Sequence, residues 1–119
     1  MEENTREVLS VTPMSNDTVE AIYDGMRQVV TSGSAASAFK GFDVKVCGKT
    51  GTAEHETGGS SNGAFICFAP MDNPEIAVAV YGEKAGSGAY MGRVARAILE
   101  YYFSADELSD TVTYENKVG

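Results

Sequence analysis

The sequence predicts an α+β fold, in which an antiparallel meander of three strands is flanked by an N-terminal and a C-terminal helix. Two segments, at about 16–32 and 89–103, repeat apolar residues at helical spacing. Three shorter apolar segments lie between them, at about 42–53, 64–69 and 76–81. Short connections join these three segments, and such connections favour antiparallel pairing.

The first helix is supported by its apolar stripe and by its ends. The stripe consists of Val19, Ile22, Tyr23, Met26, Val29 and Val30. Residues 15–17 offer N-caps, and Asp17 with Glu20 has the spacing of a capping box. Gly33 is expected to end the helix. Gly25 lies in the helix interior, where glycine costs stability, so we expect it to allow close packing against a neighbouring element.

The strand segments differ in their patterns. In the first, apolar and other residues alternate, which predicts a strand with one buried face; the apolar set is Phe42, Val44 and Val46. The third, 76–81, is apolar throughout, which predicts burial on both faces. Residues 54–63 are polar and glycine-rich and are expected to form a hairpin loop, whereas 70–74 have the composition of a turn.

The second helix is expected to bury one stripe and to expose the opposite face. The buried stripe is expected to contain Met91, Val94, Ala95, Ile98 and Tyr102. On the exposed face, Arg96 and Glu100 are spaced to form an ion pair. The tail at 104–119 is acidic and polar, and we expect it to be mobile.

Composition narrows the classes of function. The chain has 119 residues and a net charge of -8, which fits one small domain or a piece of a larger one and argues against nucleic-acid binding. His55 is the only histidine, so a site with several histidine ligands is excluded, and neither a metal nor another cofactor is predicted. We find no apolar run long enough to span a membrane and no signal peptide at the start.

Cys47 and Cys67 are the only cysteines, and they lie in different predicted strands without metal-ligand spacing. A cross-strand disulfide would form only if the strand registers allow it. Two free buried thiols are favoured instead, because cysteine is a common small core residue.

The run Gly-Lys-Thr-Gly-Thr at 48–52 is the strongest functional signal. A peptide with a terminal carboxylate that docks beside a strand needs a cation and hydroxyl donors, and Lys49, Thr50 and Thr52 supply them. Gly51 lets a substrate backbone approach, and a strand edge offers main-chain hydrogen bonds. The plain alternative is an exposed strand with a solvated lysine. A phosphate-binding loop is rejected, because Asp43 occupies the position of its first glycine.

The residues around this run resemble the C-terminal part of the transpeptidase domain of penicillin-binding proteins, and the class B-like members are most similar. The resemblance follows the family's order through most of the chain, in the segments 18–30, 48–54, 65–70, 72–80 and 89–103. It implies the partial fold of that domain, with the remainder of the domain as a partner in the parent protein.

The resemblance also implies roles for four residues. Lys49 would hold the substrate carboxylate and tune the local proton network, and Thr50 would donate its hydroxyl to the carboxylate of a peptidoglycan stem peptide or a β-lactam. Thr52 would be a second hydroxyl donor, and its N–H would be one of two oxyanion donors, each worth about 2.7–4 kcal/mol. Gly51 would leave room for the acyl group. Lys49 and Thr52 are therefore the expected catalytic residues.

The parent would cross-link peptidoglycan by acyl transfer from D-Ala-D-Ala peptides, and β-lactams would inhibit it. It would be anchored in the membrane with this domain on the extracytoplasmic side, whereas the fragment alone would be soluble. A freed strand edge and an uncovered sheet face would drive the fragment to form a homo-oligomer.

The family needs a Ser-x-x-Lys pair and a Ser-x-Asn loop, both well before the Lys-Thr-Gly run. Ser37 with Lys40 matches the first string, and residues 60–62 match the second. Their order is wrong, so we expect both matches to be accidental and the nucleophile to lie outside this chain. Two alternatives stay open: a non-catalytic module that binds carboxylate peptides or serves assembly, and a small enzyme that uses Ser37.

Overall fold

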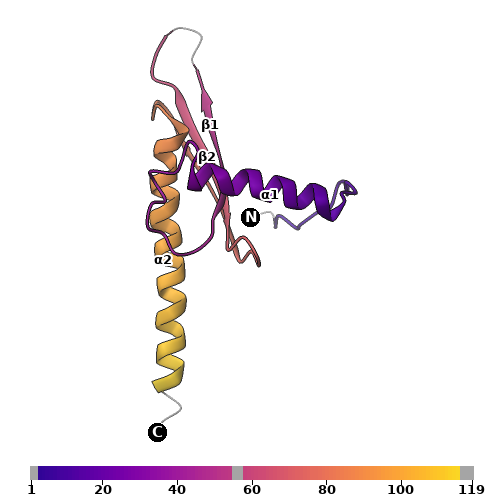
Figure 1. Ribbon diagram of the computed structural model, residues 1–119, viewed down its shortest axis with the longest axis vertical. Helices are drawn as coiled ribbons and strands as arrows, with labels where there is room; N and C mark the ends of the chain where they lie inside the picture. The colour runs from indigo at the N-terminus through magenta and orange to yellow at the C-terminus, as the bar shows by residue number, and fades with distance from the viewer. Residues whose placement is uncertain (1–2, 55–57, 116–119) are drawn as a thin grey trace.

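The structure is a computed structural model that describes residues 3–54 and 58–115, and it confirms the predicted α+β class (Figure 1). Helix α1 lies across the sheet and helix α2 runs along it. The chain order is α1 (Asn16–Thr31), β1 (Cys47–Ala53), β2 (Asn62–Ala69), β3 (Ile76–Gly82) and α2 (Gly88–Glu115).

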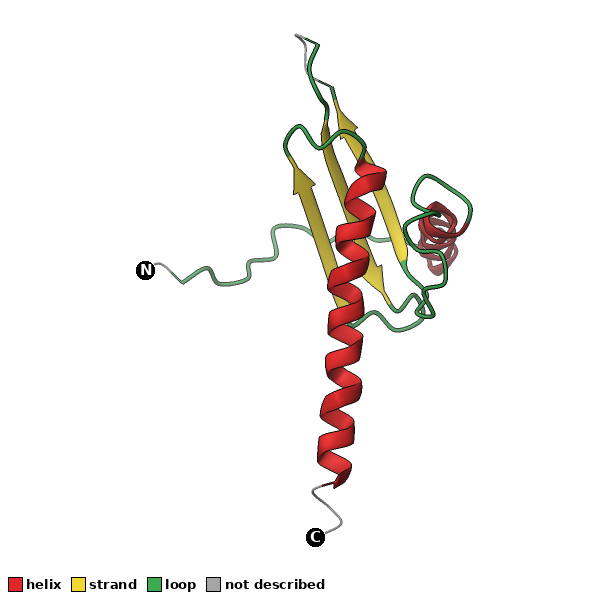
Figure 2. Cartoon of the chain, turned by 90° about the vertical axis from the view of Figure 1, so that its left-hand side faces the viewer, coloured by secondary structure: helices red, strands yellow, loops and turns green. Residues whose placement is uncertain are grey.

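The three strands form an antiparallel sheet in the order β1-β2-β3, as expected from their short connections. Cys47 lies opposite Phe68, and Ala69 lies opposite Ile76. Because successive side chains of a strand point to opposite faces, this register defines two faces. We call the face that carries Phe65 and Cys67 the α2 face, and the other the α1 face; Figure 2 shows α2 in front of the sheet.

The core lies between the α2 face and α2. Met91, Ala95 and Leu99 are buried on α2, where they join Phe65 in one cluster. Leu99 therefore takes the place that the sequence assigned to Ile98, which is 42% exposed, as is Val94. The buried apolar side chains Met91, Ala95 and Leu99 recur every four positions, so the stripe of α2 that faces the core is narrower than predicted.

Ser15, one of the predicted N-caps, caps helix α1. Its hydroxyl accepts a hydrogen bond from the Thr18 N–H, so the capping box predicted from Asp17 is not the cap. The helix ends as expected, with the Gly33 N–H bonded to the carbonyl of Gln28. The expectation for Gly25 was wrong, because a Cβ there would meet nothing within 4 Å. Packing against the described residues therefore does not require a glycine at position 25.

The first strand is shorter than predicted, since β1 starts at Cys47 and residues 42–46 are irregular. Its partner β2 ends at Ala69, and Pro70 has no N–H with which to extend the ladder. The alternation in 42–46 nevertheless reflects burial. Val46 is buried, and Phe42 and Val44 pack against the core without a strand partner.

The prediction that the third strand is buried on both faces was wrong. Residues of β3 alternate between half-buried and exposed, and the exposed ones lie on the α1 face. Helix α1 covers part of this face, where its Tyr23 packs against Phe68 of β2 at 4.8 Å between ring centres. Ile66 is 52% exposed and Tyr81 is 64% exposed.

The expected mobile tail is largely helical, because α2 continues to Glu115. Residues 104–115 contain neither glycine nor proline, so no helix-breaking residue ends the helix after the predicted apolar stripe. The rest of that tail, 116–119, lies outside the described residues, as does 55–57 of the predicted hairpin loop. None of the described helices combines the length and apolarity that a membrane span requires.

Candidate functional site

The Gly-Lys-Thr-Gly-Thr run lies in the middle of β1, at an edge of the sheet. Within the described chain, β1 pairs only with β2, so its other side has no strand neighbour. Such an edge presents backbone N–H and C=O groups that another extended chain can use. The run therefore stands where a peptide could align.

Lys49 is exposed, and its ammonium donates a 2.7 Å hydrogen bond to the carbonyl oxygen of Thr50. This carbonyl is thus reachable from outside the ladder. Residues two apart in a strand direct their backbone groups to the same side, so the Thr52 N–H faces the same side as the Thr50 carbonyl. The edge accordingly combines a cation with an N–H of the kind that the oxyanion role requires.

Thr50 and Thr52 lie on the α2 face, opposite to the side from which Lys49 projects. The Thr50 hydroxyl is 2.8 Å from the hydroxyl of Ser34, in the loop between α1 and β1. Sequence reasoning missed Ser34, because nothing in its spacing connects it with Thr50. Only the course of the loop brings the two side chains together.

The Thr52 hydroxyl accepts a 3.3 Å hydrogen bond from the Gly88 N–H, at the first residue of α2. Gly88 is buried, and a Cβ at this position would clash with the Gly51 carbonyl oxygen and lie 2.6 Å from that of Ala64. Glycine at 88 therefore lets the helix start approach the site strand, and Thr52 is held by that helix.

Two glycines of the run differ in what they do. A Cβ on Gly48 would lie 2.6 Å from the Phe65 ring, so internal packing excludes a side chain there. A Cβ on Gly51 would meet only ordinary contacts, the nearest being the Ala64 Cβ at 3.6 Å. Packing against the described residues therefore does not require glycine at 51, and the expectation that Gly51 leaves space for a ligand stays a prediction.

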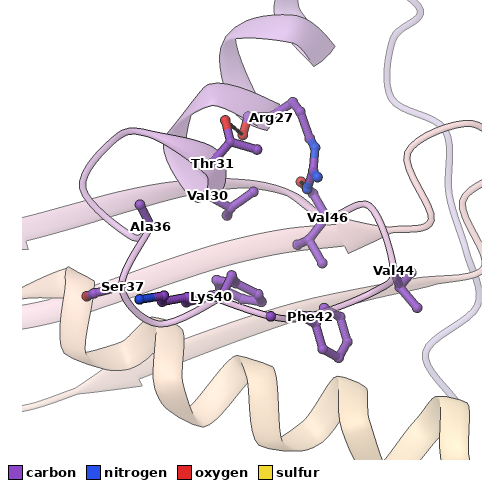
Figure 3. Close-up of a pocket in the computed structure, with 11 residues that line it drawn as sticks. Arg27, Val30, Thr31, Ala36, Ser37, Lys40, Phe42, Val44 and Val46 are labelled. Atoms are coloured by element: carbon purple, nitrogen blue, oxygen red, sulfur yellow. Dashed lines mark hydrogen bonds between the residues drawn. The ribbon is translucent and has the colours of Figure 1, made fainter.

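The Ser-x-x-Lys match lies elsewhere, on the loop that leads from α1 toward β1. Ser37 and Lys40 are exposed residues in a series of turns, and they line a cavity of about 530 Å³ (Figure 3). Among the hydrogen bonds of the described chain, none joins Ser37 to Lys40 or to Lys49. The structure does not bring these groups together as a nucleophile and its base.

In the Ser-x-Asn match, the Asn62 side chain accepts a 2.9 Å hydrogen bond from the Lys84 N–H. The Ser61 carbonyl accepts one of 2.8 Å from the Gly86 N–H. Both bonds fasten the turn after β3 to the start of β2. The Ser-x-Asn match at 60–62 thus has a structural role, because it stabilises the turn after β3.

Both cysteines are free and buried, which confirms the favoured interpretation. Cys47 pairs with Phe68, and Cys67 pairs with Gly48, so the two thiols lie on opposite faces of the sheet. Burial raises the pKa of Cys67 to about 11, and burial likewise raises the pKa of Cys47 although the Arg27 charge opposes it. In the described residues no group of acidic, cysteine or histidine side chains could hold a metal ion.

Comparison with known proteins identifies the family of the chain. The family model described as penicillin binding protein transpeptidase domain matches residues 2–100. Penicillin-binding protein 2A of Bacillus subtilis is 30% identical over 118 residues, covering 87% of this chain and 16% of the relative. Peptidoglycan D,D-transpeptidase MrdA of Haemophilus influenzae is 32% identical, covering 71% of this chain and 16% of the relative.

A solved structure shows the same fold. Penicillin-binding protein A of M. tuberculosis, as an imipenem acyl-enzyme complex, superposes with a TM-score of 0.62 and 30% identity, covering 76% of this chain and 20% of that one. The chain spans about 16% of the length of the curated relatives. It belongs to the family of penicillin-binding protein transpeptidase domains.

Proposed function

We propose that this chain forms the Lys-Thr-Gly wall of a serine DD-transpeptidase site, and that its parent cross-links peptidoglycan. Lys49 and Thr50 bind the carboxylate of a D-Ala-D-Ala stem peptide or of a β-lactam, and the Thr52 N–H donates a hydrogen bond to the oxyanion. The family match supports this, as do a relative named as a peptidoglycan D,D-transpeptidase and a similar protein solved with imipenem as an acyl-enzyme.

The observation that carries the proposal is that one strand edge, without a second strand neighbour among the described residues, carries the Lys49 ammonium on one face and the Thr50 and Thr52 hydroxyls on the other. Each threonine oxygen already has a partner within the protein, Ser34 for Thr50 and Gly88 for Thr52. A carboxylate accepts hydrogen bonds only, so it needs donors of this kind. The charge on Lys49 strengthens such bonds beyond those between neutral groups.

Helix α2 adds to the attraction for an anion. Its first residue, Gly88, lies against Thr52, and the first turn of α2 contains no acidic residue. The positive end of a helix dipole favours a nearby negative charge by about 0.3–1 kcal/mol at an exposed position. This contribution supports Lys49 in a chain whose net charge is -8 and therefore unfavourable to anions.

A binding measurement tests whether Lys49 and Thr50 bind a peptide carboxylate. N-acetyl-D-Ala-D-Ala and its C-terminal amide would be titrated into the full chain, into Lys49→Gln and into Thr50→Val. We expect the acid to bind several-fold more tightly than the amide, and each substitution to weaken the acid about 3- to 10-fold. Lys45→Gln is the matched control, because Lys45 is an exposed lysine just before β1. Equal binding of the acid and the amide would contradict the proposal.

We further propose that the nucleophile is not Ser37 and is supplied by the rest of the transpeptidase domain. The supporting observation is that Ser37 lies in a turn without a hydrogen bond to Lys40. Intact mass after incubation with a penicillin tests this, with Ser37→Ala as control. A covalent adduct that the control loses would establish the small-enzyme alternative. Reversible binding without an adduct would be consistent both with this proposal and with a non-catalytic binding or assembly module.

Mixing the chain with the preceding part of a class B transpeptidase domain would separate these last two. Restored acylation by penicillin, lost again in Lys49→Gln, is expected if the chain is a wall of the active site. Failure to restore acylation, with peptide binding intact, would favour the binding module.

A further inference from the structure

We propose that Ser34 is a positioning residue for substrate binding: its hydroxyl donates to the Thr50 oxygen and thereby turns the Thr50 proton toward the substrate carboxylate. The inference rests on the proposed carboxylate site and adds a residue to it. Ser34 lies 16 positions before Thr50, outside the Lys-Thr-Gly run.

The direction of the bond follows from counting donors. The two hydroxyl oxygens are 2.8 Å apart, and either could donate. A hydroxyl has one proton, and an ionised carboxylate has none to give. If Thr50 donates to the carboxylate, it cannot also donate to Ser34. Ser34 must therefore be the donor whenever the ligand is bound.

Thr52 provides an internal comparison for this arrangement. Its partner is the Gly88 backbone N–H, which can only donate, so the Thr52 oxygen is an acceptor and its own proton is left for another group. Thr50 and Thr52 lie on the same face of β1, two residues apart. The protein thus donates a hydrogen bond to each threonine oxygen: the Gly88 N–H donates to Thr52, and the Ser34 hydroxyl donates to Thr50.

Backbone hydrogen bonds and packing fix the loop next to Ser34. The N–H of Ala35 donates to the Val29 carbonyl at 3.0 Å, and the N–H of Ala36 donates to that of Gly33 at 3.1 Å. Ala35 is fully buried and packs close to Gly92 of α2. An anchored loop presents the Ser34 hydroxyl at a fixed place, whereas a free loop would lose rotamer and backbone entropy on every binding event.

Binding of N-acetyl-D-Ala-D-Ala to single and double variants tests the proposal. We expect Ser34→Ala to weaken binding about 3- to 5-fold and Ser34→Thr, which keeps the hydroxyl, to restore most of it. Ser37→Ala, which removes another exposed serine of the same loop, should have no effect. In a Thr50→Val background the Ser34→Ala change should also have no effect, since Ser34 acts only through the Thr50 hydroxyl. An equal loss in both backgrounds would overturn the proposal.

A second measurement, on the chain without ligand, separates this inference from the proposed function. Three-bond NMR couplings report whether the Thr50 side chain occupies one rotamer. We expect one rotamer in the wild type and in Ser34→Thr, and averaging in Ser34→Ala. If the peptide does not bind at all, the proposed function fails, and these couplings still decide whether Ser34 fixes Thr50. Unchanged couplings in Ser34→Ala would overturn the positioning role.

Discussion

The Thr52 hydroxyl and the Gly88 N–H are joined by a 3.3 Å hydrogen bond that ties the site strand β1 to the first residue of α2. The contact is short-range in space and long-range in sequence, with 36 positions between the two residues. It makes the geometry of the Lys-Thr-Gly edge depend on how closely the helix start approaches the sheet.

Gly88→Ala should therefore disturb both stability and the site. The new methyl group would overlap the Gly51 carbonyl oxygen, so α2 or β1 must shift. We expect a loss of about 1–3 kcal/mol in the free energy of unfolding, measured by urea denaturation, together with weaker peptide binding. Gly25→Ala is the control, because that helical position is open and alanine there should stabilise by about 0.5–1 kcal/mol. Equal stability of the two variants would contradict the close approach.

Arg96 fastens α2 to the loop that carries Ser34. Its guanidinium donates to the carbonyls of Ala38 at 3.1 Å and Lys40 at 2.7 Å, and it lies 5.6 Å from the centre of the Phe42 ring. Arg96→Ala should cost about 2–3 kcal/mol by thermal or urea unfolding, because it removes these bonds and leaves carbonyls without a donor.

The matched comparison for Arg96 is Glu100→Ala. Glu100 forms the exposed ion pair with Arg96 at 2.7 Å, as its spacing predicted. Loss of this pair alone should cost no more than about 0.5 kcal/mol. If Glu100→Ala were as costly as Arg96→Ala, the ion pair rather than the carbonyl bonds would be the main contribution of Arg96.

Stability should fall in alkaline solution because of Cys67. Its pKa is about 11 in the folded chain and 9.0 ordinarily, and burial is the cause. Well below pH 9 the thiol is protonated in both the folded and the unfolded chain, so the stability that the buried Cys67 side chain contributes is fully present. As the pH rises from about 9 to 11 the unfolded chain releases this proton first, and we expect a loss on the order of 2 kcal/mol.

The Cys67 contribution is isolated by comparing urea unfolding of the wild type and of Cys67→Ala across this pH range. The difference between their free energies of unfolding should shrink as the pH rises, since other groups titrate equally in both. A difference that is independent of pH would contradict the raised pKa.

The chain by itself should associate through the uncovered part of its α1 face. Ile66 and Tyr81 are exposed there, and β3 lacks a second neighbour among the described strands. Light scattering across concentrations should show a dimer or larger species, which Ile66→Lys with Tyr81→Lys disperses. Leu9→Lys is a control, because Leu9 is 86% exposed on the extended N-terminal segment. A wild-type monomer at all concentrations would contradict this expectation.

The sequence predicted the elements that rest on local chemistry. The structure contains the helix predicted from the apolar stripe of α1 and the antiparallel meander predicted from the short connections. It also contains the ion pair predicted from the spacing of Arg96 and Glu100. The errors came from tertiary context. The start of β1 depends on where its partner ends, and the exposure of β3 depends on how little of the α1 face is covered, so neither can be derived from a residue pattern alone.

The same distinction holds for the site. Lys49, Thr50 and Thr52 could be singled out because they are consecutive or nearly so in one strand. Ser34 and Gly88 could not, since a loop and a helix start bring them to the strand from 16 and 36 positions away. Residues that support a site from other elements have no spacing rule, and only the fold shows them.

The carboxylate site on β1 can be located by NMR, by mapping the amide shifts as N-acetyl-D-Ala-D-Ala is added to the full, isotope-labelled chain. We expect the largest shifts at Lys49, Thr50 and Thr52 on the β1 edge, and much smaller ones when the C-terminal amide of the peptide is added instead. Shifts centred on the cavity beside Ser37 and Lys40, or none on β1, would contradict the proposed site.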